Sequence, residues 1–103
     1  MKSFVIDSRR FSSFSGFLKY ADEVLCVGFK SGRNMNAFHD ILMGGFGAFD
    51  YEEEIEIVWS GAAKSKRDLG DSYGWVVDAI RSKGHIAFRE EEPIQLPETT
   101  RGE

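Results

Sequence analysis

The hydrophobic pattern of the chain switches repeatedly between two periods. Three short apolar runs, at residues 4–6, 55–59 and 85–88, have the length of buried strands. The segments between them repeat apolar residues every three or four positions, which is typical of amphipathic helices. Strands that are separated by helical crossovers form parallel sheets. The expected fold is therefore α/β, a small three-stranded parallel sheet packed with about four helices in the order β-α-α-β-α-α-β.

The first helix is predicted to follow Ser12 or Ser13, because either hydroxyl could cap it. Its apolar residues recur at i, i+3, i+4 and i+7, and Asp22 belongs to the polar set that should face solvent. Cys26, at the end of the apolar face, is expected to be a small buried hydrophobic residue.

The second helix is the segment with the most varied side chains. Asn34 is a good N-cap, and Gly44 with Gly45 can supply the left-handed residue that ends a helix. The stripe expected to be buried consists of Met35, Phe38 and Leu42. A second face carries an amide, an imidazole, a carboxylate and a thioether, from Asn36, His39, Asp40 and Met43. This face is either merely solvated or meets a partner.

The second half of the chain predicts a short basic helix at residues 60–69 and a further helix capped by Asp71 or Ser72. Trp59 and Trp75 are both expected in the core or at its edge, because large aromatic side chains are usually buried.

Length and charge restrict the number of domains and the kind of partner. The 103 residues favour one domain, at 1–89, followed by an acidic and flexible tail at 90–103. Of the net charge of -4, residues 89–103 hold -3, from two Arg and five Glu, which leaves -1 for the rest. Because residues 1–88 are nearly neutral, they lack the excess of positive charge that is typical of nucleic-acid-binding proteins. We interpret the cluster of acidic residues at 50–56 as a solvent-exposed segment that leads into a strand, rather than as a binding patch.

The single cysteine excludes an intrachain disulfide and a cysteine-based zinc cage. No run approaches 18 apolar residues, and the N-terminus lacks a signal-peptide pattern. We therefore expect a soluble, cytoplasmic protein of a reducing compartment, without membrane association.

The candidate catalytic groups do not form a recognisable site. Residues 44–47 are rich in glycine, but they follow a predicted helix, whereas a phosphate-binding loop joins a strand to a helix. His39 and Asp40 are adjacent, so on a helix they diverge by about 100° and cannot act as a pair. Two histidines and one cysteine make no convincing metal site. We expect no enzymatic activity, no catalytic residues, no metal and no cofactor.

Several short motifs share their order and spacing with one family. They are Val5-Ile6, the Phe11, Phe14 and Phe17 register, Gly32-x-Asn34-Met35-x-Ala37-Phe38-x-Asp40-x-Leu42-x-Gly44, Ile57-Val58-Trp59 and Ser65-Lys66. Through these motifs the chain, as far as about Phe88, resembles the barstar family of small cytoplasmic ribonuclease inhibitors and looks like a divergent branch of it. The resemblance implies a three-stranded parallel sheet with helices and a protein partner.

The resemblance also implies a binding site. In barstar-like inhibitors the second helix and the loop before it enter the ribonuclease active site, where a carboxylate takes the place of a substrate phosphate. Asp40 matches the position of this carboxylate. The surrounding contact is assigned, on the same grounds, to Lys30, Ser31, Asn36, His39, Met43 and Gly44.

The chain departs from the family pattern at several contact positions. Lys30 and Ser31 replace two tyrosines, and Gly45 replaces a large aromatic residue. Ala79 and Lys83 replace acids on the last helix. Only one strong acid of a cluster remains, so we expect a partner whose surface differs from that of the usual target.

Three hypotheses about function follow. The first is a barstar-like inhibitor, or antitoxin, that occludes the active site of a ribonuclease or a related nuclease toxin. The alternative is a protein-binding or immunity-like module with a non-nuclease partner, which the lost acids and the near-neutral body favour. The third, a small enzyme or ligand binder, would need a deep pocket lined by His39 or His85.

Overall fold

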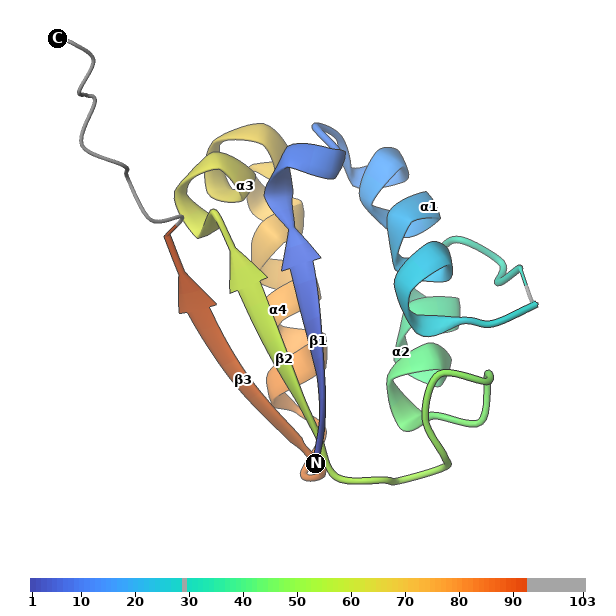
Figure 1. Ribbon diagram of the computed structural model, residues 1–103. Coiled ribbons are helices and arrows are strands. Elements are labelled where there is room, and N and C mark those ends of the chain that lie inside the picture. The colour runs from blue at the N-terminus through green and yellow to red at the C-terminus, as the bar shows by residue number, and fades with distance from the viewer. Residues whose placement is uncertain (29, 93–103) are drawn as a thin grey trace, which may run out of the picture.

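Three parallel strands and four α-helices form the part of the computed structural model that is described, residues 1–28 and 30–92 (Figure 1). The strands are β1 (Lys2–Asp7), β2 (Ile55–Ser60) and β3 (Ile86–Glu91). The helices are α1 (Phe14–Leu25), α2 (Met35–Met43), α3 (Ala62–Leu69) and α4 (Asp71–Arg81), with a 3-10 helix, η1 (Ser8–Arg10), after β1. The predicted fold class and order of elements are confirmed.

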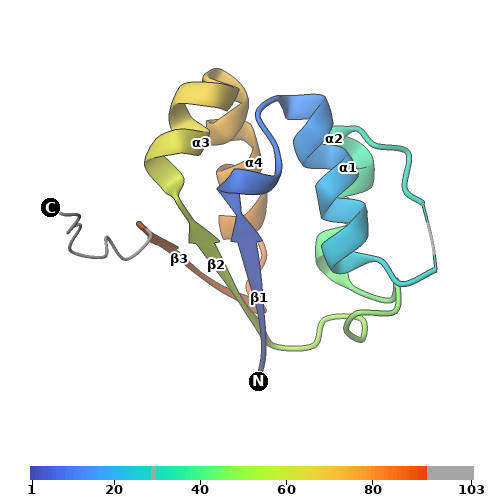
Figure 2. The same cartoon turned by 45° about the horizontal axis from the view of Figure 1, so that its top comes forward.

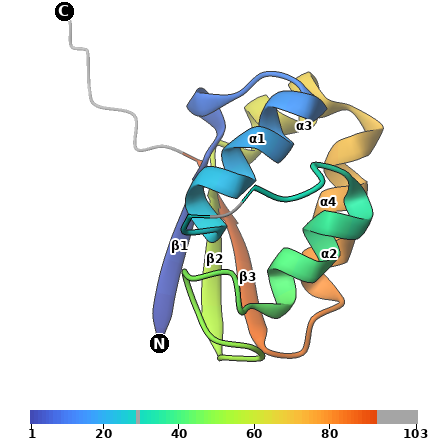
Figure 3. The same ribbon diagram turned by 90° about the vertical axis from the view of Figure 1, so that its right-hand side faces the viewer.

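The sheet has the order β1-β2-β3, and both pairings are parallel. Ile57, in the central strand, pairs with Phe4 on one side and with Phe88 on the other. Side chains alternate between the two faces of a strand, so these three side chains point to the same face of the sheet. The helices cover this face, as Figures 1 and 3 show, while Val5 on the opposite face is exposed.

The helix α2 belongs with α1 to the first crossover and connects it to the second, because it contacts both α1 and α4. Figure 2 shows α1 and α2 together on one side of the molecule and α3 with α4 on the other. Among the described residues, no helix is both long and apolar enough to cross a membrane.

Trp59 of β2 joins the two crossovers to the sheet. Its side chain is completely buried, stacks on Phe17 of α1 at 5.3 Å between ring centroids and meets Tyr73 of α4 edge-on at 5.0 Å. The indole N–H donates to the hydroxyl oxygen of Ser65 in α3 at 2.8 Å. Because a buried N–H needs an acceptor, the spacing between Trp59 and Ser65 has a structural cause.

The predicted helix boundaries in the first half of the chain are confirmed. Ser13 caps α1, since its hydroxyl oxygen accepts from the backbone N–H of Gly16 at 3.0 Å. Asn34 caps α2 in the same way, with its side-chain oxygen 2.8 Å from the nitrogen of Ala37. Gly44 ends α2 with a φ of 96°, a backbone angle that favours glycine.

The predicted cap of α4 was wrong. The helix starts after Gly70 without a side-chain cap, and Asp71 is its first residue. Ser72 lies inside the first turn, where its hydroxyl donates to the carbonyl oxygen of Leu69 at 2.6 Å. Because the connection between α3 and α4 is short, the hydroxyl of Ser72 bonds to a carbonyl oxygen at the end of α3 instead of capping α4.

Two further details qualify the predictions. Trp75, expected in the core or at its edge, lies at the edge, because it is 55% exposed and contacts Phe14, which packs against the core. The last strand continues to Glu91, two residues beyond the predicted domain boundary at residue 89. Residues 93–103 of the predicted tail lie outside the described residues.

We expect Ser65→Ala to lower the free energy of unfolding by about 1–3 kcal/mol, because it leaves the buried indole N–H of Trp59 without an acceptor. Urea denaturation of the variant and the native protein measures this difference. Ser12→Ala, at an exposed position, is the control and should change stability by less than about 0.5 kcal/mol. Equal stability of the two variants would contradict the structural role of Ser65.

Candidate partner-binding surface

The helix α2 divides its side chains between core and surface. Its buried side consists of Phe38, Ile41 and Leu42, while Met35 of the predicted stripe is only partly buried. The second predicted face reaches the surface, with Asn36 and Asp40 exposed and His39 and Met43 partly buried. The four side chains predicted to share one face therefore do so, on a helix that is held by the core beneath it.

Asp40 presents an unpaired carboxylate near the middle of this helix. None of the ion pairs within the described residues involves it. An exposed carboxylate fixed at a helical position can accept hydrogen bonds from a cationic side chain of another protein.

Next to Asp40, the imidazole of His39 is joined to the segment that follows α4. The ammonium nitrogen of Lys83 lies 3.0 Å from Nδ1 of His39. An ammonium group can only donate, so Nδ1 accepts and the ring proton is on Nε2. The contact thus brings a positive charge to the edge of the α2 face, at a position where the family resemblance predicts an acid.

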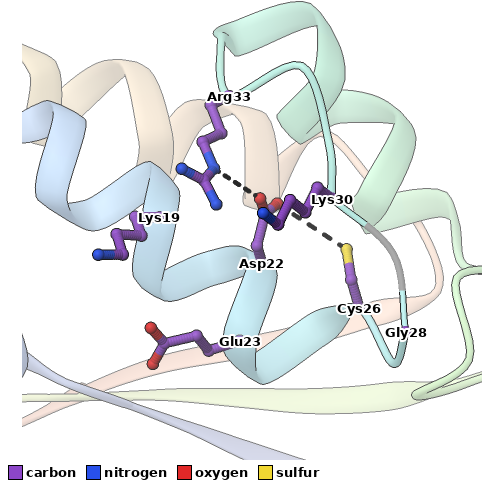
Figure 4. A pocket seen from close by; sticks show the side chains of 7 residues that line it. All are labelled: Lys19, Asp22, Glu23, Cys26, Gly28, Lys30 and Arg33. Carbon is purple, nitrogen blue, oxygen red and sulfur yellow. Dashed lines mark hydrogen bonds and ion pairs between the residues drawn. The ribbon is translucent and has the colours of Figure 1, made fainter.

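The loop before α2 is held by a buried carboxylate of α1. Figure 4 shows Asp22 pointing toward this loop, where it accepts from the backbone N–H of Ser31 at 3.2 Å and from Nε of Arg33 at 3.0 Å. Arg33 has a φ of 54°, which is uncommon for a residue with a side chain, and its own N–H donates to the hydroxyl oxygen of Ser31 at 3.0 Å. These bonds hold Ser31 and Arg33 against α1.

The prediction that Asp22 faces solvent was wrong, since only 5% of the residue is exposed. Burial opposes the charged form, but the hydrogen bonds from Ser31 and Arg33 outweigh it and hold the pKa of Asp22 below its ordinary value of 3.8. Asp22 is therefore an ionised group whose partners all belong to the loop that leads to α2 or to its own helix.

A hollow of about 470 Å³ opens beside this carboxylate, between α1 and the loop. Its wall includes Lys19 and Lys30, so Lys30 faces α1 rather than extending the exposed face of α2 (Figure 4). Cys26 lies at the inner end and is buried, as predicted. Burial, together with the charge of Asp22, raises the pKa of the Cys26 thiol to about 11, which keeps it protonated at neutral pH.

At the other end of α2, Gly44 is buried beneath the following loop. A Cβ atom there would lie 2.2 Å from the carbonyl oxygen of Asp50, so no other residue fits. The role visible in the structure is to end the helix, and contact of Gly44 with a partner stays a prediction.

His85 is held by the end of the same helix. Its Nε2 lies 2.8 Å from the carbonyl oxygen of Leu42, which can only accept, so this nitrogen carries the proton. Across the described part of the chain, no group of three or more His, Cys, Asp or Glu residues is arranged to hold a metal ion.

Asp22→Asn removes the charge of the buried carboxylate while keeping its shape. We expect a loss of about 1–3 kcal/mol in the free energy of unfolding at neutral pH, because hydrogen bonds to a buried ionised group are lost. The folded-state pKa of Asp22 is depressed, so its contribution is present above the unfolded value of about 3.8 and lost as the pH falls through the folded value.

The stability gap between the native protein and Asp22→Asn should therefore narrow as the pH falls below 3.8. Urea denaturation at neutral pH and at about pH 3 measures it. Asp78→Asn, at an exposed site of α4, is the matched control. A gap of the same size at both pH values would show that ionisation of Asp22 is not the cause.

Comparison with known proteins agrees with these features. A protein-family model described as Barstar (barnase inhibitor) matches residues 1–96. No curated protein shows significant similarity to the chain. Barstar-family proteins are inhibitors that bind ribonucleases and are not enzymes, so the expectation of a non-catalytic protein is confirmed. With nearly its whole length matched, the chain belongs to the barstar family.

Proposed function

We propose that the protein inhibits a ribonuclease, or a related nuclease toxin, by inserting the exposed face of α2 into its active site. Asp40 supports this proposal most directly, because its carboxylate is exposed, forms no ion pair with any described residue and is held on a helix. In the complex it would take the place of a substrate phosphate and pair with an arginine or lysine of the enzyme. The proposed compartment is the cytoplasm, where such an inhibitor would protect the cell as an antitoxin.

The proposal is also supported by the fact that the contact elements are already held in a defined conformation before binding. Asn34 caps α2, and Asp22 fixes Ser31 and Arg33 in the loop that precedes it. A surface that is already ordered loses less conformational entropy on association than a flexible one. Asn36, His39 and Met43 would surround Asp40 in the contact.

Positive charge near the α2 face favours a partner whose surface differs from that of the ribonuclease usually bound by the family. Lys83 brings an ammonium group to His39 at the edge of this face, and Lys30, although it faces α1, adds an exposed cation in the loop before the helix. A partner that presents only cations would be repelled by these two groups. We therefore propose an enzyme with both acidic and basic groups around its active site.

The same charges support the alternative of an immunity-like module whose partner is not a nuclease. The two functions differ in one observable. An inhibitor slows RNA cleavage, whereas a module of the second kind binds its partner through Asn36, Asp40 and Met43 without any effect on nuclease activity.

We expect the native protein to slow RNA cleavage by its target ribonuclease at micromolar concentration and Asp40→Ala to inhibit at least tenfold less, because loss of one charge-assisted contact costs about 1.5–3 kcal/mol. A fluorogenic RNA substrate and a panel of basic microbial ribonucleases, including barnase, provide the assay. Asp78→Ala removes an exposed carboxylate of α4 and is the control. Inhibition that is equal in Asp40→Ala and Asp78→Ala would exclude the proposed role of Asp40.

A further inference from the structure

A second hollow, of about 550 Å³, opens at the C-terminal end of α2. Met43 and the acidic residues Glu52 and Glu54 line it from one side, and Lys83 and His85 line it from the segment between α4 and β3. The two segments meet here because the backbone N–H of Ile55 donates to the carbonyl oxygen of His85 at 3.1 Å. Figure 1 shows both connections toward the same end of the molecule, the lower end in that view.

This hollow is continuous with the exposed face of α2. Met43 belongs to both, since it lies one helical turn after Asp40 and also lines the hollow. Lys83 lines the hollow and is bonded to His39 of the same helical face. A partner that covers Asp40 and Met43 therefore lies at the edge of the hollow.

The two glutamates in the hollow are not neutralised. Glu52 and Glu54 are exposed, and among the described residues neither takes part in an ion pair or a side-chain hydrogen bond. Lys83 is the nearby cation, but its ammonium group is directed to His39. The carboxylates thus remain available for a positive group from outside.

The backbone that presents Glu52 is well defined. Its φ of 58° is rare for a residue with a side chain, and such a conformation persists only where its surroundings fix it. Here the N–H of Glu52 donates to the carbonyl oxygen of Met43 at 2.7 Å. The next residue, Glu53, accepts from the N–H of Asp50 at 2.8 Å, which closes the turn. Glu52 is therefore tied directly to the last residue of α2.

We propose that this hollow is a second binding site for the protein partner and that it receives an arginine or lysine side chain, whose charged end pairs with Glu52 and Glu54. The aliphatic part of such a side chain can lie along Met43 while its head reaches the carboxylates. Tyr51, 67% exposed in the same turn, adds an aromatic surface beside the glutamates. This inference rests on the proposed function, since it assumes that the partner covers α2.

The site replaces contacts that the chain lacks elsewhere. Ala79 and Lys83 stand where the family resemblance predicts acids, and Gly45 stands where it predicts a large aromatic residue. The turn that follows α2 carries an aromatic residue and two free acids instead. The acidic segment at 50–56 is thus more than the solvated strand entrance that its sequence indicates, because Glu52 and Glu54 share one hollow with Met43.

A first experiment tests the hollow without a nuclease. The ¹⁵N-labelled protein is titrated with the peptide acetyl-Gly-Arg-Arg-Gly-amide, and the amide chemical shifts are followed by NMR. We expect saturable shifts at Met43, Glu52 and Glu54, and shifts at least about threefold smaller in Glu52→Gln/Glu54→Gln, since both charges are removed. Acetyl-Gly-Glu-Glu-Gly-amide is the control peptide. Shifts that are absent, or equal in the variant, would overturn the proposal.

A second experiment uses the ribonuclease that the native protein inhibits most strongly in the panel. We expect Glu52→Gln/Glu54→Gln to weaken inhibition about tenfold, because charge-assisted hydrogen bonds are lost, and the control Glu23→Gln/Asp78→Asn to leave it unchanged. Inhibition that needs Asp40 but not the two glutamates would refute the second site and leave the proposed function intact. Peptide binding to the hollow without inhibition of any ribonuclease would refute the proposed function instead.

Discussion

The candidate binding surface depends on the ionised carboxylate of Asp22, the only charged side chain that is buried among the described residues. Residues 30–34, which lead into α2, lie outside the helices and strands, so their backbone groups need partners from elsewhere. Asp22 supplies a hydrogen-bond acceptor for the backbone N–H of Ser31. It also binds the guanidinium of Arg33, a residue whose backbone conformation is unfavourable by itself. Through this one carboxylate, α1 fixes the direction from which the chain enters α2.

The fold was predictable from the sequence because hydrophobic periodicity and helix caps are local signals. The apolar run at 55–59, the cap at Asn34 and the glycine at 44 each act within a few residues of themselves. Trp75 shows the limit of arguing from residue type, because it lies two positions after Tyr73, about 200° round the helix from a buried residue. Its position on the helix, rather than its size, decides that it is exposed.

The candidate site was predictable only in part. The 3.6-residue period places Asn36, Asp40 and Met43 on one face of α2, and the family resemblance singles out Asp40. The bond between Lys83 and His39 joins residues 44 positions apart, and no local pattern indicates it. The same is true of Glu52. Its charge was visible in the sequence, but its place beside Met43 depends on the turn that brings the chain back to the end of α2.

The parallel arrangement of the sheet has a consequence for how the chain folds. Parallel strands cannot be joined by a tight turn, so Lys2 must find Ile55, and Ile55 must find Ile86, across long stretches of chain. Closing loops of this length costs more chain entropy than bringing Asp22 to Arg33, which are 11 residues apart. The loop segment that leads into α2 is therefore fixed by a short-range contact, whereas the sheet that supports it requires long-range ones.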